Sequence, residues 1–212
     1  MKIPRHIGII PDGNRRWAQK NNLNKHEGYN FGLNPGLEVF KLAQEYKIEE
    51  ITFYGFTTDN CKRPAVQVKA FANACVEAIN LLMDEKISLL VVGNSDSKNF
   101  PSSLLEFTER KNLNGGGMKV NFLINYGWDW DLENLKCNAG RKKIASSLRS
   151  SDISRIDLII RWGGMRRLSG FLPVQSVYSD FFVVDKMWPQ FSQNDFINAL
   201  QWYSKQDCTL GG

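Results

Sequence analysis

Short apolar runs alternate with longer amphipathic stretches along this chain, and the alternation predicts the order of its strands and helices. Each apolar run is short enough to form a buried β-strand. The predicted strands are 6–10, 51–56, 88–92, 118–125, 156–161 and 181–184. The first of them ends at Pro11, because proline cannot continue the hydrogen-bond ladder of a sheet.

Between the strands, apolar residues recur every three or four positions, which is the spacing of an amphipathic helix. Leu33, Leu37, Phe40 and Ala43 follow it. The predicted helices begin after Asn14, cover 33–46, begin at Pro64, cover 101–111, 131–148 and 173–178, and begin again near Ser192. The alternation predicts a single α/β domain with a mainly parallel six-stranded sheet flanked by helices.

Length and composition fit this prediction. A chain of 212 residues, 42% of them hydrophobic, has the size of one ordinary domain, so we assign residues 1–212 to one domain. No apolar run has the eighteen or so residues of a membrane span. Asp12 interrupts the first apolar stretch too early for a cleaved signal peptide. We expect a cytoplasmic protein without a membrane span, and peripheral contact with a membrane stays open.

The charge favours small anionic substrates. A formal net charge of +5 is compatible with nucleic acid, a membrane surface or anionic substrates. The basic residues are mostly dispersed and lack an RNA-binding pattern, so no nucleic acid is expected. Zinc sites and disulfides are not expected either, because no ligand or framework spacing joins the cysteines and histidines, which are Cys61, Cys75, Cys137, Cys208, His6 and His26.

Polar segments follow four of the predicted strands. Residues 12–16 follow the first strand, 57–63 the second, Asn125 the fourth and 161–169 the fifth. Ligands of open α/β sheets bind outside the carboxyl ends of the strands, so these segments are expected at one edge. Their arginines and glycines suit two diphosphates, and Asp12 suits Mg²⁺ bound to one of them. Singly, each feature is also typical of a turn or a surface ion pair.

Five ordered motifs give the chain a family resemblance. They are Asp12-Gly-Asn-Arg-Arg-Trp-Ala, Tyr54-Gly-Phe-Thr-Thr-Asp-Asn-Cys-Lys-Arg-Pro, Asn125-Tyr-Gly, Arg161-Trp-Gly-Gly-Met-Arg-Arg-Leu-Ser and Trp188-Pro. In this order the motifs resemble those of the cis-prenyltransferases, whose best-known members are the undecaprenyl diphosphate synthases. The resemblance covers the chain from about His6 onward. It implies a homodimeric, Mg²⁺-dependent transferase that joins an allylic prenyl diphosphate to isopentenyl diphosphate.

The resemblance also implies roles for single residues. Asp12 is implied as a catalytic residue and metal ligand, Asn60 as a catalytic residue near the reacting centre, and Asp180 as a second metal ligand. Arg161, Arg167 and Ser169 are implied for the second diphosphate. The full set implied in substrate binding is Gly13, Asn14, Arg15, Arg16, Trp17, Lys25, Tyr29, Arg63, Arg161, Arg167 and Ser169.

Several positions depart from the family pattern. Met165 and Arg166 replace a Glu-His pair, Tyr29 replaces a histidine, Cys61 an aromatic residue and Thr209 a C-terminal arginine. These departures leave three readings open. The first is a short-chain cis-prenyltransferase, and the second is a non-catalytic partner subunit of a prenyltransferase complex.

The third reading is a lavandulyl-type enzyme, which couples two allylic diphosphates such as dimethylallyl diphosphate irregularly. The stretch 168–175 resembles the subgroup that contains such enzymes. Bulky Phe122 and Ile124 alternate along the fourth predicted strand, where an apolar channel is expected. Large side chains there would shorten the product.

Overall fold

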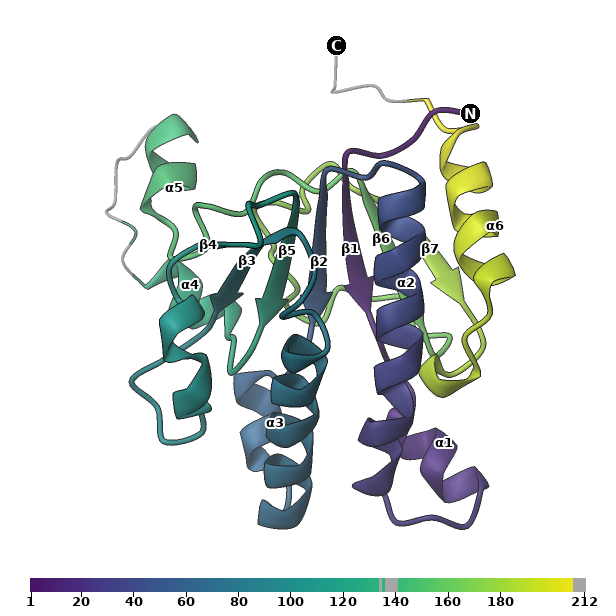
Figure 1. The fold of residues 1–212 in the computed structure, drawn as a ribbon, viewed down its shortest axis with the longest axis vertical. Coiled ribbons are helices and arrows are strands. Elements are labelled where there is room, and N and C mark those ends of the chain that lie inside the picture. The colour runs from purple at the N-terminus through teal and green to yellow at the C-terminus, as the bar shows by residue number, and fades with distance from the viewer. Residues whose placement is uncertain (134, 136–140, 208–212) are drawn as a thin grey trace.

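Seven strands form one sheet in the computed structural model, which describes residues 1–133, 135 and 141–207 (Figure 1). The strands are β1 His6–Ile10, β2 Glu50–Tyr54, β3 Ile87–Val92, β4 Lys111–Leu113, β5 Met118–Leu123, β6 Leu158–Trp162 and β7 Asp180–Val184. Their order in the sheet is β4-β3-β5-β2-β1-β6-β7. Only the pairing of β3 with β4 is antiparallel.

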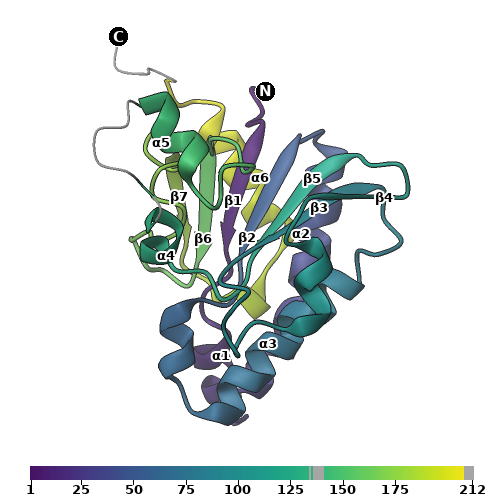
Figure 2. The same cartoon turned by 90° about the vertical axis from the view of Figure 1, so that its left-hand side faces the viewer.

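The helices divide between the two faces of the sheet. Their bounds are α1 Asn14–Lys20, α2 Leu33–Glu45, α3 Ala65–Asn80, α4 Trp128–Leu132, α5 Arg141–Ser147 and α6 Gln193–Tyr203, with the short 3-10 helices η1 Glu27–Gly32, η2 Thr58–Lys62, η3 Ser102–Phe107 and η4 Trp188–Gln190. Helices α2, α3 and α6 lie over one face (Figure 1). Helices α4 and α5 lie on the opposite side (Figure 2).

Strand side chains alternate between two buried clusters, as the pleat of a sheet requires. Ile7 and Ile9 of β1 belong to the larger cluster, which packs against α2, α3 and α6. Ile10 belongs to the smaller cluster on the other face. There the ring of Phe171 lies so close to Gly8 that a Cβ on Gly8 would come within 2.5 Å of it. Much of this second face is therefore covered by loop residues rather than by long helices.

The single-domain α/β fold with a mainly parallel sheet is confirmed, and four elements differ from the prediction. A seventh strand, β4, pairs at the edge of the sheet before the turn at 115–117, and only 102–107 of the predicted helix 101–111 is helical. Residues 173–178 form turns instead of a helix. The predicted helix 131–148 corresponds to α4 and α5, and part of the segment between them lies outside the described residues.

The start of α6 agrees with the sequence prediction. Ser192 and Asp195 form the capping box, in which the Ser192 backbone N–H donates to the Asp195 carboxylate at 3.0 Å. In the part of the chain that the structure describes, no helix combines the length and the apolar character needed to cross a bilayer.

Candidate active site

A polar cleft of about 440 Å³ lies at the carboxyl ends of β1, β2 and β6. Parallel pairing sets its position, because Ile10 at the end of β1 is in register with Arg161 of β6. Five arginines and two aspartates line the cleft, so cationic groups prevail. Its charged members are Asp12, Arg15, Arg16, Asp59, Arg63, Arg161 and Arg167. Such a surplus suits a ligand with several negative charges.

The loop after β1 is held in one conformation by the segment that follows β7. Gly13 has a φ of +109°, a region in which L side chains are rare, and a Cβ there would lie 2.8 Å from the Cβ of Met187. The Trp188 backbone N–H donates to the Asp12 carbonyl at 2.9 Å. Helix α1 begins directly afterwards at Asn14 without a side-chain cap. The loop therefore presents Asp12 and the first turn of α1 to the cleft.

Two arginines contact the Asp12 carboxylate. Arg161 Nη2 donates to Asp12 Oδ2 at 2.9 Å, and Arg16 Nη2 lies 3.4 Å from Asp12 Oδ1. The Arg161 side chain is 4% exposed, whereas that of Asp12 is 33% exposed. Asp12 thus neutralises a buried guanidinium while keeping a face toward the cleft.

Arg161 also organises the loop after β6. Its Nη1 donates to the carbonyl of Arg167 and to Ser169 Oγ, the latter at 2.9 Å. Ser169 has a φ of +53°, which is uncommon for a residue with a side chain. This loop brings Arg167 and Ser169 to the cleft together with Arg161, as predicted.

Arg63 and Tyr29 meet on the side of the cleft formed by α3 and η1. Arg63 Nη1 donates to the Tyr29 hydroxyl at 2.9 Å, and the Tyr29 ring stacks on Phe71 with a centroid distance of 4.4 Å. Burial raises the pKa of Tyr29 more than the neighbouring guanidinium of Arg63 lowers it, so the hydroxyl stays neutral. Tyr29 fills the position of a family histidine with an aromatic group that bridges polar and apolar surroundings.

Asn60 lines the cleft and at the same time stabilises η2. Its Oδ1 accepts from the Thr57 backbone N–H at 3.2 Å, while its own N–H donates to Thr57 Oγ1 at 3.3 Å. These reciprocal bonds form a capping box. The amide of Asn60 is therefore fixed toward the cleft by local structure.

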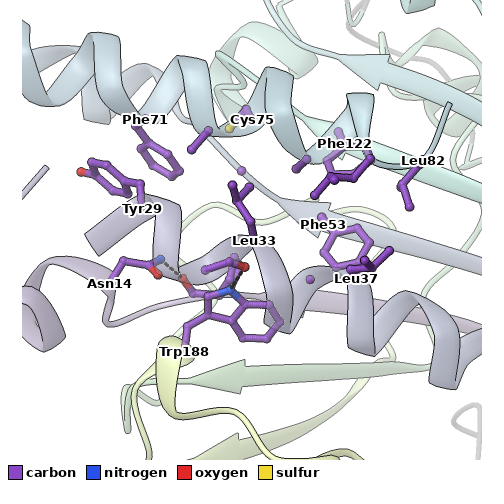
Figure 3. A pocket seen from close by; sticks show the side chains of 17 residues that line it. Asn14, Tyr29, Leu33, Leu37, Phe53, Phe71, Cys75, Leu82, Phe122 and Trp188 are labelled. Carbon is purple, nitrogen blue, oxygen red and sulfur yellow. Dashed lines mark hydrogen bonds between the residues drawn. The ribbon is translucent and has the colours of Figure 1, made fainter. Parts of the chain in front are cut away.

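An apolar cavity of about 90 Å³ adjoins the cleft (Figure 3). It runs between α2 and α3 over the sheet, and its aromatic lining side chains are Tyr29, Phe53, Phe71, Phe122 and Trp188. Phe53 and Phe122 stack with centroids 5.2 Å apart. Phe122 is thus placed as predicted, whereas the other predicted residue, Ile124, is buried but does not line the cavity. Cys75 also borders the cavity, and burial raises the pKa of its thiol to about 12.

Three buried polar atoms beside the cleft have no hydrogen-bond partner within the described residues. They are Asn14 Oδ1, Arg15 Nε and Arg161 Nε. Unpaired buried polar atoms are costly, and two of these three are donors. Their position beside the cleft is consistent with a site shaped for an anion.

Three predicted residues are not in the cleft. Trp17 packs on Phe31 with a ring distance of 4.6 Å, and neither Trp17 nor Lys25 lines the cleft. Asp180 is at the wrong edge of the sheet: it is in register with Leu158, three residues before Arg161. Three residues of strand span about 10 Å. Within one chain Asp180 is therefore too far from Asp12 to share a metal ion with it, and its role as a metal ligand stays a prediction from the resemblance.

Two groups of site residues are not predicted from the sequence. Tyr54 and Gln19 line the cleft, although the sequence pattern of the second motif places Tyr54 only in a strand. The cavity residues on α2 and α3 form the other group. Their helical spacing predicts an amphipathic face, but this periodicity does not distinguish a face that packs tightly from one that borders a cavity.

The residues present fit Mg²⁺ in one way. Asp12 offers a partly exposed carboxylate at the cleft. Among the described residues, no three or more acidic, histidine or cysteine side chains are grouped so that they could hold a metal ion by themselves. Mg²⁺ is commonly held by one or two carboxylates together with substrate phosphates and water. Asp12 would therefore hold the ion jointly with a bound diphosphate.

The cleft and cavity together define a class of protein that receives a phosphorylated ligand with an apolar tail. Residues 10–211 match the family model described as "Putative undecaprenyl diphosphate synthase". The chain belongs to this family, whose members are prenyltransferases.

Curated relatives cover nearly the whole chain. The isoprenyl transferase of Thermotoga maritima is 32% identical over 231 residues, covering 100% of this chain and 98% of the relative. The isoprenyl transferase of Bacillus subtilis is 31% identical, with coverages of 100% and 88%. A ditrans,polycis-undecaprenyl-diphosphate synthase specific for (2E,6E)-farnesyl diphosphate, from Photorhabdus laumondii, is 30% identical, with coverages of 99% and 90%.

A solved structure has the same fold. Lavandulyl diphosphate synthase from Lavandula x intermedia, in complex with dimethylallyl diphosphate, superposes with a TM-score of 0.84 over 99% of each chain. Its sequence is 21% identical to this one. The likeness supports the arrangement of strands and helices, including the seven-stranded sheet.

Proposed function

We propose that this chain is a Mg²⁺-dependent cis-prenyltransferase that condenses an allylic diphosphate with isopentenyl diphosphate and releases a short prenyl diphosphate. One observation carries the proposal: the polar cleft and the apolar cavity share lining residues. These are Pro11, Asn14, Tyr29, Gly55 and Phe71. One molecule can therefore place its diphosphate among the arginines and its hydrocarbon tail among the phenylalanines.

The allylic diphosphate is assigned to the loop after β1. When its C–O bond breaks, negative charge grows on the departing diphosphate. The backbone of Gly13, the amide of Asn14 and the guanidinium groups of Arg15 and Arg16 are placed to stabilise that charge. Mg²⁺ held by Asp12 would supply further neutralisation of the leaving group.

The second diphosphate is assigned to Arg161, Arg167 and Ser169, across the cleft from α1. Holding the acceptor there places its double bond beside the allylic carbon, so that the reaction proceeds within one oriented complex. The new carbon–carbon bond forms at the allylic carbon, and the acceptor then loses a proton. Asn60, fixed by its capping box, lies in the same cleft and would orient the reacting groups.

The shape of the cavity favours a short product. Phe53 and Phe122, paired on the neighbouring strands β2 and β5, stack on each other and line it from the sheet, and Leu37 and Leu82 also line it (Figure 3). A growing tail displaces these side chains or stops against them, and rearranging a packed core is costly. We also propose the homodimer, the cytoplasmic location and the absence of a nucleic-acid partner on the sequence resemblance and composition alone.

The test is incubation of the purified chain with Mg²⁺, labelled isopentenyl diphosphate and allylic diphosphates of different length. Product mass and double-bond geometry are then measured. Short cis products are expected, and no product from any allylic substrate would refute the proposal. Product from dimethylallyl diphosphate alone, without regular elongation, would instead support irregular coupling.

The partner-subunit reading predicts a different outcome. It requires that the purified chain is inactive by itself and stimulates a second prenyltransferase subunit. The cleft with Asp12, Asn60 and the arginines in place argues for catalysis by this chain. Activity that is unaffected by removal of the Asp12 carboxylate would favour a binding role instead.

A further inference from the structure

We infer that Tyr54 is a positioning residue that fixes the loop carrying Arg167 and Ser169 in the conformation that binds the acceptor diphosphate. Tyr54 is the last residue of β2 and lines the polar cleft. Its hydroxyl donates to the Ser169 carbonyl at 2.8 Å. This inference rests on the proposed function, because the ligand of the loop is assigned there.

The loop needs such support because its backbone is unusual. Ser169 and Leu172 have φ values of +53° and +35°, and Gly170 between them has +81°. Left-handed conformations are unfavourable for residues with a side chain unless surrounding contacts hold them. Without those contacts, the loop would relax to other conformations and carry the Ser169 hydroxyl away from Arg161.

Two donors hold the loop from different strands. Arg161 of β6 donates to Ser169 Oγ at 2.9 Å and to the Arg167 carbonyl. Tyr54 of β2 donates to the Ser169 carbonyl. In the proposed function Arg161 also contacts the acceptor, so its guanidinium is shared between the loop and the ligand. The bond from Tyr54 ends on the backbone carbonyl of Ser169, which is not assigned to the ligand, so this bond can persist throughout the reaction.

The Tyr54 side chain is itself rigid. It is 8% exposed, and its ring packs on Phe171 with a centroid distance of 5.1 Å and on Tyr126 at 6.3 Å. Burial raises its pKa well above the ordinary value, and so does the nearby Asp59 carboxylate, so the hydroxyl keeps its proton and remains a donor. A rigid donor beside a strained loop is what preorganisation of a binding site requires.

Tyr54→Phe removes this one hydrogen bond and keeps the ring. Tyr126→Phe is the matched control, because Tyr126 is also buried, donates to Asp131 Oδ2 at 2.8 Å and does not line the cleft. The expected result for Tyr54→Phe is a KM for isopentenyl diphosphate about fivefold higher, the equilibrium equivalent of one hydrogen bond. The KM for the allylic substrate should stay unchanged, and Tyr126→Phe should change neither constant.

Calorimetric binding separates the failure of this inference from that of the proposed function. The probes are isopentenyl diphosphate alone and an unreactive thiolo analogue of dimethylallyl diphosphate, each with Mg²⁺. The inference is supported if Arg167→Ala and Tyr54→Phe both weaken the binding of isopentenyl diphosphate and neither weakens the binding of the allylic analogue. If only Arg167→Ala weakens it, the positioning role is refuted and the anion site stands. If Arg167→Ala has no effect, the assignment of the acceptor site is wrong. An equal loss for both probes in Tyr54→Phe would indicate a merely structural role and would also overturn the inference.

Discussion

Replacing Asp12 by asparagine and by alanine should separate its catalytic charge from its structural contact. The Asp12 carboxylate accepts from Arg161 Nη2 at 2.9 Å, and Arg161 is 4% exposed. Asparagine keeps an acceptor oxygen of similar reach but lacks the charge. Alanine removes both and leaves one nitrogen of a buried guanidinium without its acceptor. The two variants should therefore differ from each other in stability, but both should lose activity to the same extent.

The magnitudes follow from burial. Leaving a buried donor unpaired costs about 1–3 kcal/mol, and more when the donor is charged. Because Arg161 keeps its bonds to Ser169 and Arg167, a loss of about 1–3 kcal/mol is expected for Asp12→Ala. Each kcal/mol lowers the Tm of a domain of this size by about 2–4 °C. The Tm of Asp12→Asn should stay close to that of the wild-type chain. Both variants should lose turnover by at least about 10³-fold, because each removes the carboxylate that would hold Mg²⁺ at the leaving diphosphate.

Thermal unfolding and Mg²⁺-dependent incorporation of labelled isopentenyl diphosphate measure the two effects on the same preparations. Turnover of Asp12→Asn within tenfold of the wild-type chain, at saturating substrate, would refute the metal-holding role. Equal Tm values for the alanine and asparagine variants would refute the importance of the contact with Arg161. Binding of an allylic analogue in the absence of Mg²⁺, where the linkage to the ion does not operate, should equal that of the wild-type chain and serves as the control that the cleft is intact.

Three further predictions concern other parts of the molecule. Arg167→Ala should raise the KM for isopentenyl diphosphate more than it lowers kcat, in steady-state assays with each substrate varied, because the guanidinium contacts the diphosphate before and during the reaction. Phe122→Ala should lengthen the product in mass spectra, whereas Gly36→Leu should shorten it, because Gly36 lines the cavity with open space at its Cβ position. Burial lowers the pKa of His6 more than Glu50 raises it, so the free energy of unfolding should fall as the pH drops below about 6.5. Urea titrations should show this slope, at most about 1.4 kcal/mol per pH unit, in the wild-type chain and not in His6→Gln.

The order of elements and the location of the site could be predicted from the sequence because both depend on local pattern. Apolar runs that end in Pro11, Asp12 and Gly13, or in Arg161, mark strand ends, and parallel strands bring these ends to one edge. Resemblance then added roles that spacing cannot supply. The cleft brings together Asp12, Asn60 and the arginines from three different strand ends.

The features that the sequence does not predict depend on tertiary structure. The resemblance implies Asp180 as a metal ligand, whereas the register of β7 with β6 places it at the opposite edge of the sheet from Asp12. Strand β4 has three residues, all at least partly exposed, so no apolar run announces it. To predict the cavity, one must know which side chains of α2 and α3 face each other across a gap. The helical spacing of apolar residues shows only which face of each helix is apolar.

The cleft has a surplus of cationic groups but lacks the Glu-His pair that the resemblance implies. Met165 and Arg166 take those positions, and neither lines the cleft. The second aspartate of the cleft, Asp59, is 78% exposed and pairs with Lys62 at 2.6 Å, so Asp12 is the carboxylate available for a metal ion. A divalent ion held by one carboxylate depends on phosphate oxygens for its other strong ligands. Binding of the ion and of the first diphosphate is therefore linked, and each should strengthen the other by the same factor. Removing the ion or its carboxylate therefore also weakens diphosphate binding, and only turnover at saturating substrate reports the effect on the chemical step.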